Sequence, residues 1–309
     1  MRIVSLLPSA TEILFALDLG DQVVGVTHEC DYPRAAREKP VIVHSTFDPA
    51  AMASGEIEAA VRASLEQGQG VYAVDVDALR RAGPDLIVTQ DLCDVCALPA
   101  SAVTAAIEGL ARKPQVICLK PERLADVLAD IRRVGTAAGQ GIQASHVAGE
   151  LMDRITTVGK MTARVETRPR VLCIEWVDPI YAGGHWVPEM VNLAGGEDAA
   201  GRAGQKSRIV PWEELRAARP DAIVLIACGF DVARTAREVR LLERLPGWAG
   251  LPAVQSGRVY ATDASAYFSR PGPRLVDGLE ILAHFIHPER FALPDLPGAG
   301  GPLHRFTQV

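Results

Sequence analysis

Short apolar runs alternate along the chain with longer stretches in which apolar residues recur every three or four positions. Residues 3–7, 23–26 and 86–88 are runs of strand length, and the stretches between such runs have the spacing of amphipathic helices. This alternation is typical of a parallel sheet that is covered by helices on both faces. Because the pattern restarts at Arg170, we expect an α/β fold with two lobes, each built on a parallel sheet.

A ten-residue segment occurs twice in the sequence. Residues 79–88 read LRRAGPDLIV and residues 215–224 read LRAARPDAIV, so seven of ten positions are identical at an offset of 136. Units of helix, turn and strand can share a Pro-Asp turn by chance. The restart of the pattern favours the other interpretation, in which two lobes of similar topology each hold this unit at the same place.

One long helix is expected between the two lobes. Its apolar residues form a single helical face and are Val147, Leu151, Ile155, Val158, Met161 and Val165. At about 1.5 Å per residue such a helix would be roughly 35 Å long, enough to cross a lobe boundary. We therefore divide the chain into an N-terminal lobe (1–141), the linking helix (142–166), a C-terminal lobe (167–292) and a Pro/Gly-rich tail (293–309) that is expected to be disordered.

Composition and charge exclude several classes of protein. The chain has 309 residues, a formal net charge of −6 and no basic stripe, so nucleic acid is not expected as a partner. No run approaches the roughly 18 apolar residues that a transmembrane helix needs. Met1 and Arg2 lead directly into the strand-length run 3–7, without the parts of a signal peptide, which predicts a cytoplasmic protein. The sequence also has no GxSxG, Walker A or strand-following GxGxxG pattern, which argues against an enzyme.

Three cysteines and a histidine lie in two short loops that follow predicted strands. His28 and Cys30 follow the second strand-length run. Cys93 and Cys96 follow the third. In an open α/β sheet, loops at the carboxyl ends of strands line the ligand crevice. By the offset of the repeat, Cys228 begins the equivalent loop of the other lobe, where it could face the first group.

Four interpretations of these side chains stay open. Thiolates and an imidazole could hold zinc in a tetrahedral site, or Cys93 and Cys96 could form a redox dithiol. The side chains could instead approach the metal of a bound chelate such as a corrinoid, since nitrogen and sulfur ligands suit transition metals. In the fourth interpretation the cysteines are small buried residues that fill loop space. Cys118 and Cys173, which lie inside strand-like runs, are expected to be inert core residues.

A second group of candidates follows the first strand of the C-terminal lobe. Residues 181–186 read YAGGHW, and the glycines would let the backbone approach a ligand closely. His185 could bind a metal or a propionamide, and Trp186 could offer a flat apolar face. The alternative is that His185 caps the following helix and Trp186 packs in the core. The other side chains expected around this space are Glu175, Trp176, Tyr181 and Phe230.

The N-terminal residues 3–12, IVSLLPSATE, resemble the opening strand and helix of the cobalamin and iron–siderophore binding proteins of ABC importers, the class III substrate-binding proteins. The Pro-Asp strand units are similar too, and residues 210–212 (VPW) favour the cobalamin-binding branch. The resemblance covers roughly residues 1–290 and implies two Rossmann-like lobes, one long linking helix and a ligand cleft between the lobes. It also implies ligand contacts from the loop of Phe268 and Arg270, although a salt-bridged surface role is the alternative for Arg270.

The resemblance implies a binding protein for a metal-containing tetrapyrrole, above all cobalamin or a related corrinoid, and not an enzyme. Two alternatives are kept: an intracellular zinc or iron binding protein that uses the Cys/His loops, and a thiol-dependent reductase or corrinoid-processing enzyme centred on Cys93 and Cys96. In the resembled family an acidic residue on each lobe docks on the permease. Residues 92–99 would carry the first of these but contain Asp94 and no glutamate, which counts against docking on an ABC permease.

Overall fold

The computed structural model describes residues 1–67, 70–90 and 100–306, and these form two compact α/β units. Unit 1 comprises the described residues of the ranges 1–52, 56–121 and 125–150. Unit 2 comprises those of 53–55, 122–124 and the chain from residue 151 onwards. The expectation of a two-lobed α/β fold is confirmed, while the exact boundaries proposed from the sequence stay a prediction.

Unit 1 is built on a six-stranded sheet in the order β4-β3-β2-β1-β5-β6. All neighbouring strands are parallel except β3 and β4, so the sheet is mixed and not purely parallel as expected. The chain moves outward from β1 in both directions, which makes the carboxyl ends of β1 and β5 the topological switch point. The strands are β1 (Ile3–Ser5), β2 (Val23–Thr27), β3 (Val41–Ser45), β4 (Tyr72–Val74), β5 (Leu86–Gln90) and β6 (Gln115–Leu119).

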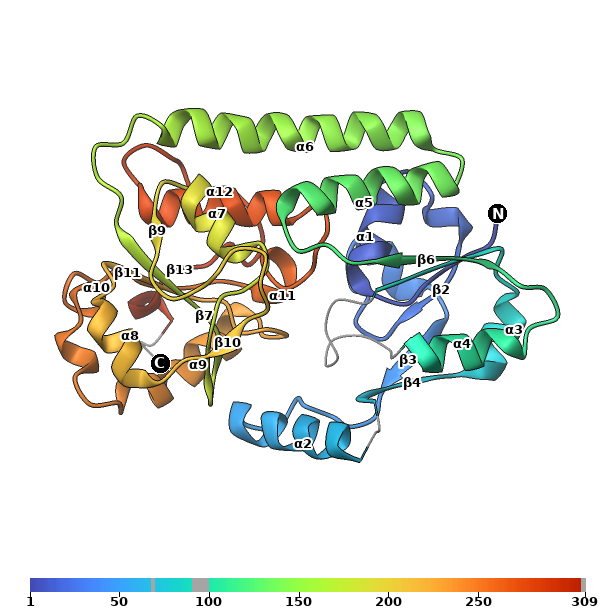
Figure 1. Cartoon of the computed structure of the whole chain (residues 1–309), viewed down its shortest axis with the longest axis horizontal. Coiled ribbons are helices and arrows are strands. Elements are labelled where there is room, and N and C mark those ends of the chain that lie inside the picture. Colours follow the sequence, from blue (N-terminus) through green and yellow to red (C-terminus); the bar gives the residue numbers. More distant parts are fainter. Residues whose placement is uncertain (68–69, 91–99, 307–309) are drawn as a thin grey trace. The chain divides into compact units, whose positions relative to one another are not determined.

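Helices cover both faces of this sheet (Figure 1). Buried residues of α3 and α4 share one core cluster with Val4 and Ile87 of the central strands. On the other face α5 packs against α1, since a Cβ on Gly135 would lie 3.3 Å from Leu17 Cδ1. The helices in this part of the chain are α1 (Pro8–Ala16), α2 (Ser54–Glu66), α3 (Val76–Ala82), α4 (Ala100–Glu108) and α5 (Leu124–Ala137), with 3-10 turns η1 (Gly20–Gln22) and η2 (Arg34–Glu38). Of these, α2 begins with residues 54–55 of unit 2.

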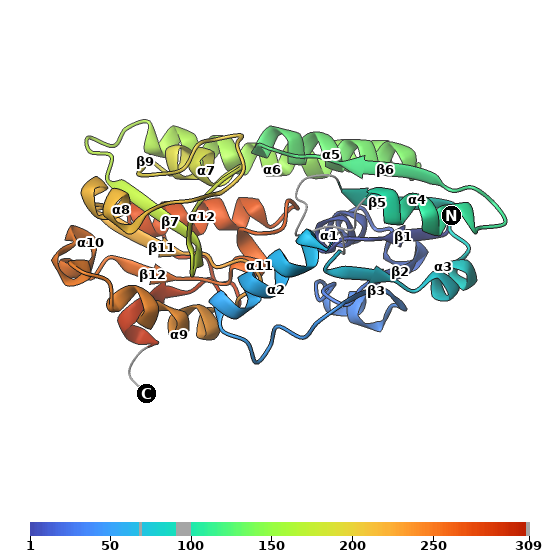
Figure 2. The ribbon, with the colours of Figure 1, turned by 60° about the horizontal axis from the view of Figure 1, so that its bottom comes forward.

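Unit 2 is built on a second mixed sheet, in the order β10-β8-β7-β11-β12-β13, with β9 added beside β7. Figure 2 shows its central strands β7, β11 and β12. The central strands β7, β11 and β12 are parallel, while β8, β10 and β13 run antiparallel to their neighbours. The strands are β7 (Arg170–Val177), β8 (Ile180–Ala182), β9 (Glu197–Asp198), β10 (Arg208–Ile209), β11 (Ala222–Leu225), β12 (Val259–Ala261) and β13 (Gly301–Pro302).

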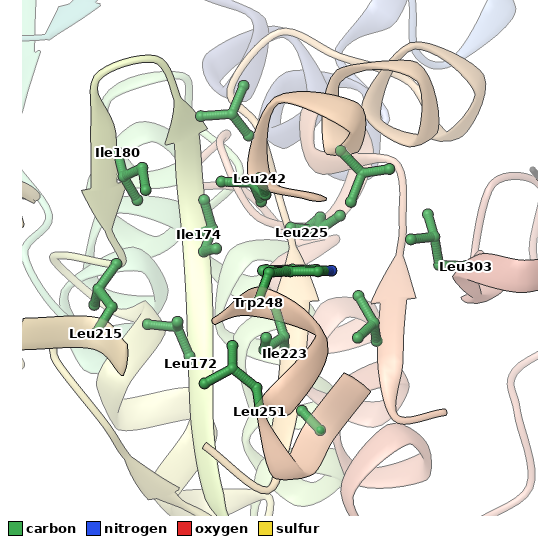
Figure 3. Packing of buried hydrophobic residues seen from close by; sticks show 14 of the residues in the cluster. Leu172, Ile174, Ile180, Leu215, Ile223, Leu225, Leu242, Trp248, Leu251 and Leu303 are labelled. Carbon is green, nitrogen blue, oxygen red and sulfur yellow. The ribbon is translucent and has the colours of Figure 1, made fainter. Parts of the chain in front are cut away.

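The largest described core cluster lies on one face of this second sheet (Figure 3). Leu172, Ile174 and Leu225 of the strands pack there against Leu242 of α9 and Trp248 of η3. The opposite face carries α7 and α12, and a Cβ on Gly196 would touch side chains from both helices. The helices are α7 (Val187–Leu193), α8 (Trp212–Ala218), α9 (Val232–Glu243), η3 (Trp248–Gly250), α10 (Pro252–Gln255), α11 (Ala264–Tyr267), α12 (Leu275–Ile286) and η4 (Leu303–Arg305).

The sequence repeat occupies the same place in each unit, which confirms that interpretation. The Asp85 N–H donates to Arg2 O (2.8 Å), and Asp85 Oδ2 accepts from the Arg2 N–H (2.9 Å). Asp221 makes the same two bonds with Arg170, at 2.8 and 2.9 Å. The repeated aspartate therefore joins the strand that follows it to the start of the first strand of its unit.

The long helix α6 (Gly141–Thr162) begins in unit 1 and ends in unit 2. Leu151, Ile155 and Val158 of the predicted apolar face are buried. Met161 is 39% exposed and Val165 follows the end of the helix, so the expected face is too long at its C-terminal end. Within the described ranges no helix is both long and apolar enough to cross a membrane.

The prediction of a disordered tail from residue 293 is wrong for the segment before residue 307. Residues 301–302 form β13, which pairs with β12, and Leu303 belongs to the core cluster. A high content of proline and glycine is typical of disordered segments. Composition does not show, however, which backbone groups find hydrogen-bond partners in the folded chain.

The two copies of the repeat differ at a residue with left-handed backbone, and this difference predicts an effect on stability. Gly83 ends α3 at φ +49°, whereas Arg219 ends α8 at φ +46°. An L side chain is strained in this region and glycine is not, so Arg219→Gly should raise the free energy of unfolding by about 1 kcal/mol. Urea denaturation would measure it.

The matched substitution in unit 1, Gly83→Arg, should lower the free energy of unfolding by a similar amount. Equal midpoints for both variants and the parent protein would contradict this account of the two turns.

Candidate functional site

The loop after β2 places His28 and Cys30 differently. Cys30 is 4% exposed, and its Sγ lies 3.0 Å from Thr11 Oγ1 and 3.3 Å from Thr27 Oγ1. His28 is exposed, and its Nδ1 lies 3.1 Å from Val43 O on the neighbouring strand. Both residues line a hollow of about 300 Å³ that Asp31 also lines. The thiol is therefore held by two hydroxyl groups of unit 1.

The described residues do not support the predicted metal site. Across 1–67, 70–90 and 100–306, no group of three or more His, Cys, Asp and Glu side chains is arranged to hold a metal ion. Cys93 and Cys96 lie outside the described residues, so their roles stay predictions. Cys228 follows β11 and is exposed, and its N–H donates to Glu175 O (3.0 Å).

The two cysteines assigned to the core differ from one another. Cys173 in β7 is buried, and burial raises the pKa of its thiol well above the ordinary value, with Asp198 and Glu175 adding to the effect. Cys118 in β6 is exposed, so the prediction of a core position is wrong for it. β6 is the edge strand of its sheet, and one of its faces is open to solvent.

His185 lies at the turn between β8 and α7 and has a left-handed backbone, with φ +50°. Its N–H donates to Gln205 O (2.6 Å), and its carbonyl accepts from the Gly204 N–H (2.8 Å). The ring is half-buried and stacks on Trp186 at 5.5 Å between centroids. A chain segment that the sequence did not single out, residues 201–207, therefore holds His185 by its main chain.

The imidazole of His185 has an unused nitrogen. Its Nδ1 is buried and has no hydrogen-bond partner among the residues that the structure describes. Burial lowers the pKa of His185, against a smaller opposite effect of Glu122, and Lys206 lowers it further. The ring is therefore neutral near pH 7. A neutral imidazole can ligate a metal, and it can donate a hydrogen bond to a ligand or accept one from it.

The two glycines before His185 serve the packing of the chain. A Cβ on Gly184 would lie 2.2 Å from Ser207 N, and one on Gly183 would lie 2.7 Å from Val187 Cγ1. The Gly184 N–H donates to Glu175 Oε1 (3.0 Å). The close approach is thus made by the backbone of Ser207 at Gly184 and by the Val187 side chain at Gly183, and the expected approach of a ligand stays a prediction.

Three aromatic residues that were expected to face a ligand are buried. Trp186 is 4% exposed and its indole N–H donates to Phe268 O (2.8 Å), which favours the core alternative for this residue. Phe268 and Phe230 are each 2% exposed. Arg234 lies over the Phe230 ring with its Cζ 3.9 Å from the centroid, and the Trp176 ring lies 5.1 Å away.

The remaining candidates of unit 2 are half-buried, and most of them gather at one end of β7. Trp176 pairs with Tyr181 across β7 and β8, and Glu175 bonds to the turn that leads to His185. Arg270 lies after α11, where its charge lowers the pKa of Asp263 against the larger opposite effect of burial. These half-buried polar side chains are the candidate site that the structure leaves accessible.

The lowered pKa of His185 predicts a dependence of stability on pH. In the unfolded chain this group titrates near its ordinary value of 6.5, and in the folded chain it binds a proton less readily. Its contribution to stability is therefore present above that value and is lost as the pH falls through the lower folded pKa. Imidazole NMR should show the lowered pKa.

The variant for this test is His185→Asn, because asparagine tolerates left-handed backbone. The loss of unfolding free energy between pH 7.5 and 5 should be smaller in this variant. An equal loss in the variant and in the parent protein would show that His185 does not cause the dependence.

Known proteins share this fold over nearly the whole chain. The structure of the periplasmic heme-binding protein RhuT from Roseiflexus sp. RS-1, in apo form, matches with a TM-score of 0.71 at 25% identity. The match covers 93% of this chain and 98% of that protein.

Two curated proteins are similar in sequence over most of their length. An uncharacterized ABC transporter substrate-binding lipoprotein, YvrC of Bacillus subtilis (strain 168), is 26% identical over 94% of this chain and 81% of its own. A vitamin B12-binding protein of Vibrio parahaemolyticus is 24% identical over 92% of this chain and 89% of its own. The expectation of a cytoplasmic protein is therefore wrong, because these relatives point to a location outside the cytoplasm. The argument from residues 92–99 against docking on an ABC permease is not supported either.

The profile of one protein family also covers most of the sequence. The family is described as periplasmic binding protein, and its profile matches residues 3–266, which are 264 of the 309 residues. The matched range includes the central strands of both units and the loops at their carboxyl ends. The chain therefore belongs to the periplasmic binding protein family.

Proposed function

We propose that this protein binds a metal-containing tetrapyrrole and delivers it to an ABC permease, with a corrinoid such as cobalamin as the first candidate. The observation that carries the proposal is the similarity to a vitamin B12-binding protein over 92% of the chain. Heme is the second candidate, because the structural relative at TM-score 0.71 is named as a heme-binding protein. Both ligands present a metal and a large ring edged by polar groups.

The half-buried side chains at the carboxyl end of β7 fit such a ligand. The His185 ring is neutral and half-buried, and its exposed part could meet the metal or a polar group of the ligand. Glu175, Tyr181 and Arg270 would supply polar contacts, and Trp176 an apolar one. The burial of Trp186, Phe230 and Phe268 speaks against walls made of these rings, so the proposal leaves them out.

Delivery to a permease is supported by the lipoprotein from Bacillus subtilis, which is named as a substrate-binding part of an ABC transporter. Residues 92–99 have no glutamate, but they lie outside the described residues and place no limit on docking elsewhere.

The two alternatives have less support. A zinc or iron protein would need a cluster of ligands, and the described parts of the chain hold none of three or more. An enzyme centred on Cys93 and Cys96 would differ from the relatives above, which are named as binding proteins.

Absorbance titration of the purified protein with cyanocobalamin and with hemin tests the proposal. One of the two should bind and shift its visible bands. His185→Asn should weaken this binding about tenfold, which is the loss of roughly 1.4 kcal/mol from one ligand contact. The matched control is His146→Asn, since His146 lies on the exposed side of α6 and should leave the affinity unchanged.

Two outcomes would contradict the proposal or move the proposed site. A protein that binds neither compound and carries stoichiometric zinc would favour the metal-protein alternative. A band shift that depends on Cys30 and not on His185, as judged from Cys30→Ser, would move the site to the loop after β2.

A further inference from the structure

The C-terminal segment of residues 297–303 is built into unit 2. In β13, Pro302 lies opposite Tyr260 and Gly301 lies opposite Ala261 of β12. Leu303 is 8% exposed and joins the core cluster at the edge shown in Figure 3. The segment therefore adds both an antiparallel strand and an apolar anchor to a sheet whose preceding strand, β12, ends at Ala261.

The glycines of this segment are needed for its docking. Gly300 has φ +82°, and a Cβ there would lie 1.9 Å from Ala261 O. Any other residue at this position would be strained and would also push the segment off β12. The Pro/Gly-rich composition is thus compatible with an ordered strand that lies very close to its neighbour.

The segment also binds both ends of the short helix α11. Gly298 O accepts from the Asp263 N–H (3.0 Å) and from Thr262 Oγ1 (3.3 Å) just before the helix. Pro297 O accepts from the Tyr267 hydroxyl (2.6 Å) at its end. Asp263 in turn caps the helix, since its Oδ1 accepts from the Ala266 N–H (2.8 Å).

A helix of four residues cannot hold its own position, because helix formation gains stability only over many residues. The place of α11 therefore depends on what it packs against. On one side α12 lies so close that a Cβ on Gly278 would be 2.1 Å from Tyr267 O. On another side the Trp186 indole N–H donates to Phe268 O (2.8 Å). The segment 297–303 contacts α11 on a third side.

We propose that residues 297–303 act as a brace that positions the loop 268–270, and that Tyr267 is the positioning residue through which the brace acts. Arg270 of the proposed site lies at the end of this loop. The consequence for ligand binding rests on the proposed function, whereas the positioning of the loop does not.

Gly300→Ala tests the brace, with Gly257→Ala as its matched control. Gly300 and Gly257 both lie in unit 2 and have positive φ, but a Cβ on Gly257 would meet nothing within 4 Å. The readout is the indole N–H signal of Trp186 in a ¹H–¹⁵N spectrum, assigned by its absence in Trp186→Phe. In Gly300→Ala this signal should shift, and its hydrogen should exchange at least about tenfold faster than in Gly257→Ala.

Tyr267→Phe removes one hydroxyl and keeps the ring, so it tests the brace even if Gly300→Ala fails to fold. The exchange of the Trp186 indole hydrogen should rise about threefold in this variant. A Trp186 signal that is unchanged in Tyr267→Phe, or that responds equally to both glycine variants, overturns the proposal.

A measurement of ligand binding distinguishes a failure of the brace from a failure of the proposed function. If the parent protein binds cyanocobalamin or hemin, Tyr267→Phe should weaken that binding about threefold or more without lowering the number of sites. Unchanged affinity together with a shifted Trp186 signal would overturn the role in binding. If neither compound binds the parent protein, the proposed function fails, and the Trp186 signal still decides whether the brace positions the loop.

Discussion

Each unit of this protein depends on a pair of hydrogen bonds between one aspartate and the start of its first strand. Asp85 joins Arg2, and Asp221 joins Arg170, through the same main-chain and carboxylate groups. The pair sets the register of the first strand against the strand that follows the aspartate, and these strands are the buried centre of each sheet.

The candidate site of unit 2 lies at the other end of β7. Glu175 leaves the strand there and binds the glycine turn, and the segment 201–207 holds the backbone of His185. The half-buried ring then has a lowered pKa and a nitrogen without a partner in the described structure. Burial of an unpaired polar atom costs about 1–3 kcal/mol, a cost that is commonly retained at functional sites.

The ordered C-terminal segment shows how composition and structure can differ. Proline and glycine suggested disorder, yet Gly300 is the residue that lets the segment lie against Ala261. The same holds for Gly184, whose missing side chain leaves room for the backbone of Ser207. A glycine in a sequence indicates that something comes close to the backbone, and only the fold shows what it is.

The sequence by itself determined the α/β class, the repeat and most of the helices and strands, because these depend on local periodicity and on the Pro-Asp turns. It also indicated His185, through its place after a strand and before a helix. The tertiary structure decided which side chains are covered. Alternation along a strand shows that a residue lies on one face but not whether a helix packs on that face, so the exposure of Cys118 could not be predicted. Trp186 and Phe230 lie outside strands, and their burial depends on segments that are distant in sequence, such as Phe268 for Trp186. Contacts between distant segments, such as Gln205 with His185 and Pro297 with Tyr267, leave no local pattern and arise only when the chain is folded.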